Sequence, residues 1–340
     1  MAVTVHDVAK AAGVSASTVS RVFNNNPDIA DATAARVRSA AQSLGYKRTS
    51  ARGRPAAWRT KRTGNIAVLV PDVHREALRT PLMGQVLEGV ERVLREKHLN
   101  LILAGLEEQE RLPSCLEPPQ VDGLIIRMGP LFAALEARLP EIPRVWIFEP
   151  PAAPLHGDIV HPDNEAVAQL ALQYLVARAH RHLAVLDALP AHYAARPRRE
   201  AFVRGAAALG VTAQVLTRKE GIRELLDEWQ ALVQRPTGLF IPIGDNHTED
   251  VYRGLRERGV QPCEDVGLVA CNNDADRLAA LDPRLPNVDI RGDEIGKAAT
   301  EVLLWRIEHP REPQRRVLIT PRLAEEGAKS ASRASGTRKP

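Results

Sequence analysis

The chain has 340 residues, enough for two or three domains with buried cores, and its net charge is +4. The charge is uneven, because residues 1–62 contain eleven Lys or Arg against three acids, whereas the remainder contains 35 against 39. A basic N-terminal region on an acidic body predicts a polyanionic partner for that region alone, the alternative being a merely solvated cationic face.

The N-terminal region is predicted to form three short helices. The first, VHDVAKAAG, has apolar residues at helical spacing and stops at Gly13, a residue suited to a turn. Ser15 is expected to cap a second helix, SASTVSRVFN, and a third helix is expected from about Ala32 to Gly45. The residues expected on the apolar faces of these helices are Val5, Val8, Ala9, Ala12, Val19, Val22, Phe23, Ala34, Val37, Ala41 and Leu44.

Two helices joined by a glycine turn, with short polar side chains and Arg21 exposed on the second, are typical of the helix-turn-helix, a reader of the major groove of double-stranded DNA. The segments VTVHDVAKAAGVSASTVSRVFN and ARVRSAAQSLGY resemble the DNA-binding domain of the lactose-repressor (LacI/GalR) family of bacterial transcription regulators. The resemblance implies base contacts by Ala16, Ser17 and Arg21.

The chemistry of these three residues agrees with that role. Arginine can form two hydrogen bonds with the edge of a guanine, serine can donate or accept a hydrogen bond, and alanine can contact the methyl group of a thymine. The resemblance also implies contacts to backbone phosphates, made by Ser15, Thr18, Ser20, Asn24 and Tyr46. For Ser20 the alternative is a plain serine on the helix surface.

The basic segment after the third helix departs from the family. Family members form a hinge helix here on DNA and insert its leucine into the minor groove. This chain has no leucine between Tyr46 and Asn65, and Gly53 with Pro55 disfavours a continuous helix. The run RGRP instead resembles the core of an AT-hook, whose arginines, here Arg52 and Arg54, enter a narrow A/T-rich minor groove. The alternative is a flexible basic tether that contacts phosphates only.

The rest of the chain alternates between β-rich runs and helical stretches. The runs are NIAVLV, LNLILA, DGLIIR, RVWIF, HLAVLD, TGLFIP and VGLVAC, and PLMGQVLEGVERVLREK is one of the helical stretches. This alternation predicts an α/β fold with parallel sheets flanked by helices. Because the strands are too many for one compact sheet, we expect two similar α/β subdomains with a cleft between them.

The resemblance continues over this region through VDGLIIR, RREAFVRGAAALG and EIGKAATEVLLWRI, among others. It implies a periplasmic-binding-protein-like effector domain, with the chain crossing between subdomains near residues 158, 285 and 319. We therefore predict a helix-turn-helix DNA-binding domain at 1–48, a basic linker at 49–64, an effector-binding and dimerisation domain at 65–326 and a disordered basic tail at 327–340. No heptad pattern marks a tetramerising coiled coil, so a homodimer is expected.

The resemblance further implies a small-molecule effector, a sugar or sugar derivative. Arg198 falls on the ligand-binding arginine of the family, and Asn272 falls where members often carry an aspartate. Asp245 falls on the aspartate of an "ND" pair in which Gly244 replaces the asparagine. Both departures argue against a simple sugar. The other candidates follow strands: His74, Phe148 and Glu149. In the alternative interpretation, Asp245 only caps a helix and Arg198 only pairs with a surface acid.

Together these features predict a transcription regulator, most simply a repressor, whose affinity for its DNA operator is set by the effector. A transport-type binding protein would have a signal peptide and no N-terminal helices of this kind. No apolar run has membrane-spanning length, so a soluble, cytoplasmic protein without membrane association is expected.

An enzyme is not expected, because the chain has no G-x-G-x-x-G, G-x-x-x-x-G-K, G-x-S-x-G or H-E-x-x-H motif. Capping and strand-end roles explain the imaginable catalytic set of His161, Asp163 and Asp187. The three cysteines show no CxxC spacing and no nearby histidine cluster, so neither a zinc site nor a disulfide framework is predicted. We expect no metal and no cofactor.

Overall fold

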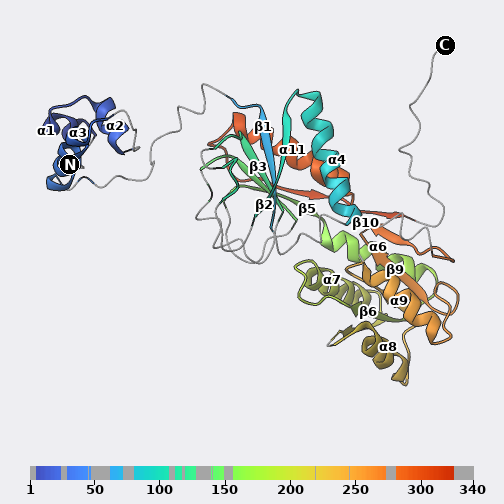
Figure 1. The fold of residues 1–340 in the computed structure, drawn as a ribbon. Helices are drawn as coiled ribbons and strands as arrows, with labels where there is room; N and C mark the ends of the chain where they lie inside the picture. The colour runs from blue at the N-terminus through green and yellow to red at the C-terminus, as the bar shows by residue number, and fades with distance from the viewer. Residues whose placement is uncertain are drawn as a thin grey trace, which may run out of the picture. The chain divides into compact units, whose positions relative to one another are not determined.

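The chain divides into two units, residues 1–61 and residues 62–340 (Figure 1). The computed structural model describes residues 5–23, 29–44, 46, 62–71, 80–106, 112–116, 119–127, 139, 141–148, 156–218, 220–244, 246–272 and 281–324. Within these ranges, no helix is long and apolar enough to cross a membrane.

The first unit contains the three expected helices, α1 (Val5–Ala12), α2 (Ala16–Phe23) and α3 (Asp31–Ser43). Small side chains dominate its core, which lets the helices approach closely: the buried residues are Val8, Ala9, Ala12, Val19, Val22, Val37 and Ala41. Leu44 departs from expectation, because it follows the last turn of α3 and remains 39% exposed.

The second unit contains two six-stranded sheets, and we call the layers around them the first and second subdomains. The sheet of the first subdomain has the order β11-β5-β4-β3-β1-β2, and all of its neighbouring strands are parallel. Its elements are β1 (Asn65–Pro71), α4 (Pro81–Glu96), β2 (Asn100–Leu106), β3 (Gly123–Arg127), β4 (Arg144–Ile147), β5 (Asp158–Pro162), α11 (Gly292–Glu308) and β11 (Arg316–Ile319).

The sheet of the second subdomain has the order β12-β10-β9-β8-β6-β7, and only the edge pair of β10 and β12 is antiparallel. Its apolar side chains alternate between a face covered by α6 and α7 and a face covered by α8 and α9. Its elements are α6 (Asn164–Ala177), β6 (His182–Asp187), α7 (Ala195–Ala208), β7 (Thr212–Thr217), α8 (Ile222–Ala231), β8 (Gly238–Phe240), α9 (Asn246–Glu257), β9 (Gly267–Cys271), β10 (Asn287–Asp289) and β12 (Arg322–Ala324).

The chain passes between the subdomains three times, as the sequence predicts. The crossings lie between β5 and α6, between β10 and α11, and between β11 and β12. The first two are a few residues later than expected, because β5 and β10 still belong to the sheets that precede each crossing. The seven β-rich runs all contain strands of these sheets, so the predicted α/β class with two subdomains is confirmed.

Helices α4 and α11 lie side by side against the first sheet (Figure 1). Glycines bring their backbones together: a Cβ atom added at Gly89 would lie 1.9 Å from the carbonyl oxygen of Asp293, and one added at Gly296 would lie 2.0 Å from that of Val86. Both helices present apolar side chains to the same core, including Val90 of α4. This packing places α4 and α11 in close backbone contact on the same core.

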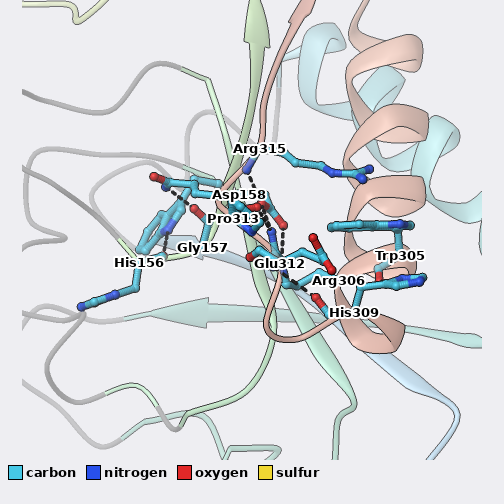
Figure 2. A network of polar contacts seen from close by, with 11 residues as sticks. His156, Gly157, Asp158, Trp305, Arg306, His309, Glu312, Pro313 and Arg315 are labelled. Carbon is cyan, nitrogen blue, oxygen red and sulfur yellow. Dashed lines mark hydrogen bonds and ion pairs between the residues drawn. The ribbon is translucent and has the colours of Figure 1, made fainter.

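A buried ion pair ties the end of α11 to the start of β5 (Figure 2). Arg306 Nε lies 2.8 Å from Asp158 Oδ2, and Arg306 Nη2 lies 2.7 Å from Asp158 Oδ1. The two side chains are 10% and 0% exposed. The hydrogen bonds that Arg306 donates to Asp158 raise the pKa of Arg306 further above its ordinary value, although burial opposes this shift.

The same pair holds the loop between α11 and β11 (Figure 2). The backbone N–H of Arg315 donates to Asp158 Oδ1 over 2.7 Å. Arg306 donates to three carbonyl oxygens of the loop, those of His309, Glu312 and Pro313. One arginine and one aspartate therefore anchor the loop between α11 and β11 within the first subdomain.

Candidate DNA-binding head and effector site

The corner between α1 and α2 is built as the sequence predicts. Gly13 has φ of +65°, a left-handed conformation that costs glycine little. Ser15 Oγ accepts the backbone N–H of Thr18 over 3.1 Å, which caps α2, and it also contacts Thr18 Oγ1 at 2.8 Å. The hydroxyls of Ser15 and Thr18, two of the five predicted phosphate contacts, are therefore engaged with each other at the start of α2.

The described residues of α2 present an exposed arginine beside a packed face. Arg21 is exposed, whereas Ala16 is partly buried and packs against the core of the first unit. Tyr46 lies with its ring centroid 5.8 Å from that of Phe23, so it sits at the end of α2. The side chains of Ser17 and Ser20, and all of Asn24, Arg52 and Arg54, lie outside the described residues.

Arg198 occupies a buried polar cluster at the carboxyl edge of the second sheet. It is 1% exposed, although it lies in the first turn of α7. Its Nε donates to Asn164 Oδ1 over 2.8 Å, and its Nη1 lies 2.7 Å from the carbonyl oxygen of Pro242. The same Nη1 lies 3.1 Å from Cys271 Sγ and 3.2 Å from Asn272 Oδ1. We call these five residues the Arg198 cluster.

Two of the predicted ligand residues thus meet directly, Arg198 and Asn272. The alternative of a surface ion pair for Arg198 is wrong, because the side chain is buried among neutral acceptors. Asn272 has φ of +76°, a left-handed conformation in which asparagine is enriched. A Cβ atom at Gly244 would lie 2.0 Å from the carbonyl oxygen of Cys271, which explains physically why no asparagine stands there.

Phe148 approaches the second subdomain from the end of β4. Its φ is +70°, which is uncommon for a bulky residue, and it is 1% exposed. Its ring centroid lies 6.3 Å from that of Tyr193, which belongs to the loop before α7. The guanidinium carbon of Arg127 lies 5.8 Å from the same Phe148 ring. Aromatic contact therefore joins the two subdomains near the strand ends.

The remaining candidates divide into those placed elsewhere and those not described. His74, Glu149 and Asp245 lie outside the described residues. Asp163 caps α6 by accepting the N–H of Ala166 over 3.0 Å, as its structural interpretation predicts. Asp187 forms an ion pair with Arg199 and is fully buried. Within the described ranges, no group of three or more His, Cys, Asp or Glu residues could hold a metal ion.

Three residues that contact the predicted ligand residues were not predicted as ligand contacts from the sequence. Asn164 and Cys271 contact Arg198, and Tyr193 contacts Phe148. Asn164 begins α6, Cys271 ends β9 and Tyr193 lies in the loop before α7, and these positions are the only local signal that they give. Their partners are distant in sequence, and no short motif connects them.

Comparisons with known proteins agree with this architecture. Residues 4–49 match the bacterial regulatory proteins, lacI family, and residues 172–327 match the periplasmic binding protein-like domain. The HTH-type transcriptional regulator PtxS of Pseudomonas aeruginosa is 32% identical over 342 residues, which cover 96% of this chain and 95% of that protein.

Two solved structures share the fold. The transcriptional regulator CelR–cellobiose complex superposes with a TM-score of 0.67 at 23% identity, covering 95% of this chain and 98% of the other. The lac repressor dimer bound to operator and the anti-inducer ONPF superposes with a TM-score of 0.63 at 20% identity, covering 96% and 98%. The chain therefore belongs to the lacI family of bacterial regulatory proteins, and it is a DNA-binding transcription regulator rather than an enzyme.

Proposed function

We propose that the chain is a repressor that binds operator DNA as a homodimer and that a small molecule bound between its two subdomains controls operator affinity. The Arg198 cluster is the observation that carries the effector site, because it collects polar side chains where strands of a parallel sheet end. Ligands of open α/β sheets bind outside the carboxyl ends of strands. The lac repressor structure, with operator and anti-inducer, and the CelR–cellobiose complex support the same assignment by likeness of fold.

The test uses a panel of sugars and sugar derivatives: D-glucose, D-ribose, D-gluconate, D-ribonate, D-glucose 6-phosphate and D-ribose 5-phosphate. At least one member should shift the operator Kd of the parent protein. An effector can shift DNA affinity only by its differential affinity for two conformations, typically 1–3 kcal/mol or about 5–150-fold. No shift with any member contradicts the proposal.

Arg198→Ala is expected to abolish that shift, because it removes the donor around which the cluster is arranged. Operator binding is measured by fluorescence anisotropy with and without the effective panel member. Circular dichroism and effector-free operator binding report whether the variant still folds. A normal response to effector in the folded variant means that the site lies elsewhere.

The linker carries a second part of the proposal, that Arg52 and Arg54 bind the minor groove at an A/T-rich operator centre. Its support is the run RGRP, since narrow A/T-rich grooves concentrate negative potential and attract arginine. The double variant Arg52→Ala with Arg54→Ala should then lose more affinity on an A/T-centred operator than on a G/C-centred one.

The two interpretations of the linker separate in one experiment. Parent and double variant are titrated with both operators at two salt concentrations. Equal losses on the two operators, with the salt slope reduced by roughly one unit per lost cation, identify a tether that contacts phosphates only.

A further inference from the structure

Arg198 is a buried cation without a counterion in the described part of the chain. Its side chain is 1% exposed, and every acceptor around it is neutral: two side-chain amide oxygens, one backbone carbonyl oxygen and the sulfur of Cys271. Removing a guanidinium from water without a compensating negative charge is unfavourable. Among the described residues, the cluster therefore holds one positive charge and no negative charge to balance it.

The adjacent arginine on the same helix provides a contrast. Arg199 is 24% exposed, yet it has a counterion of its own, the fully buried carboxylate of Asp187. Among the described residues, the more exposed Arg199 has an acidic partner and the more buried Arg198 has none. Asp187 is engaged with Arg199, and no hydrogen bond or ion pair joins it to Arg198.

The polar atoms that remain available around Arg198 are donors. Among the described residues, neither Arg198 Nη2 nor Asn272 Nδ2 has a hydrogen-bond partner. The N-terminus of α7 adds partial positive charge beside Arg198, since its N-cap, Ala194, contributes no capping side chain. A neutral hydroxyl is bound best by a donor and an acceptor together, whereas donors alone match carboxylate or phosphate oxygens.

We infer that the effector carries an anionic group, a carboxylate or a phosphate, which binds Arg198 Nη2 and Asn272 Nδ2. The inference rests on the proposed function and specifies its ligand class. The anion supplies the charge that the cluster lacks and accepts hydrogen bonds from both available donors. A neutral sugar would leave the buried guanidinium without a counterion in the bound state as well.

Asn272→Asp tests this with almost no change of shape. It places a carboxylate where the amide oxygen now lies 3.2 Å from Arg198 Nη1, and aspartate tolerates the left-handed conformation as asparagine does. Without ligand, the thermal midpoint should rise by about 2–4 °C, the shift expected for about 1 kcal/mol in a domain of this class. The anionic panel members should bind at least tenfold more weakly than to the parent, because the new carboxylate competes for Arg198 and repels them.

The matched control is the same substitution in an Arg198→Met background. There the new carboxylate has no guanidinium to pair with, so Asn272→Asp should lower the ligand-free midpoint instead of raising it. The difference between the two backgrounds measures the coupling of residues 198 and 272. The affinity for D-gluconate is compared with that for D-glucose 6-phosphate, and the affinity for D-ribonate with that for D-ribose 5-phosphate. The tighter member of each pair identifies whether the site accepts a carboxylate or a phosphate.

The outcomes keep this inference separate from the proposed function. If only D-glucose or D-ribose shifts operator affinity, the effector role stands and the anionic class is wrong. The anionic class is equally wrong if the anionic members bind Asn272→Asp as tightly as the parent, or if the ligand-free midpoint of that variant does not rise. A panel without any active anionic member also overturns it.

Discussion

Asp158→Asn is expected to lower the free energy of unfolding by about 3–5 kcal/mol, the cost of removing one partner of a buried ion pair. The asparagine would turn one side-chain N–H toward donors of Arg306, which now makes a two-point contact with the carboxylate (Figure 2). The guanidinium would stay buried without its counterion. Urea unfolding monitored by tryptophan fluorescence measures the change, since Trp305 directly precedes Arg306.

The control for this prediction is a surface pair in the same subdomain. Glu91 and Arg95 lie 3.5 Å apart on α4, and their side chains are 48% and 70% exposed. Glu91→Gln should change stability by less than about 1 kcal/mol, because water screens an exposed pair. If Asp158→Asn costs no more than Glu91→Gln, the ion pair does not hold the loop between α11 and β11.

Arg21→Ala is expected to reduce operator affinity by about 1–3 kcal/mol, or roughly 5–150-fold, and to relax specificity at one base pair. The side chain is exposed on α2, so the substitution leaves the core of the first unit intact. Its guanidinium can make two hydrogen bonds to the O6 and N7 atoms of guanine, a pattern that no other base pair presents. Competition binding with operators substituted at each position locates the affected base pair.

Arg36→Ala is the matched control, since Arg36 is an exposed arginine of the same unit on α3. Its loss should leave the order of preference among operator sequences unchanged. An equal loss of affinity for every operator in the Arg21 variant would instead make Arg21 a phosphate contact, with a reduced salt slope.

The sequence by itself determined the elements and the family. The helices of the first unit follow from apolar residues at helical spacing, a serine at the cap of α2 and glycine at the corner, all of which act within a few residues. Seven strands of the second unit follow from short β-rich runs between turn residues, whereas β5, β7, β10, β11 and β12 were not predicted from the sequence. Such local signals could not predict that Leu44 stays exposed, because that depends on where the neighbouring helices end.

Only the tertiary structure decided how the polar side chains are used. Asp158 and Arg306 are 148 residues apart, and Arg198 and Asn272 are 74 apart. The sequence marked Arg198 and Asn272 as candidates through the family pattern, but it did not show that Arg198 is buried with no acidic partner among the described residues. The tertiary packing determines which charged side chains lie close together, because an ionic contact acts over a few ångströms in space whatever the separation along the chain. The burial of Arg198 among neutral acceptors of the described residues is therefore a property of the folded chain, which appears only once the strands and α7 are assembled.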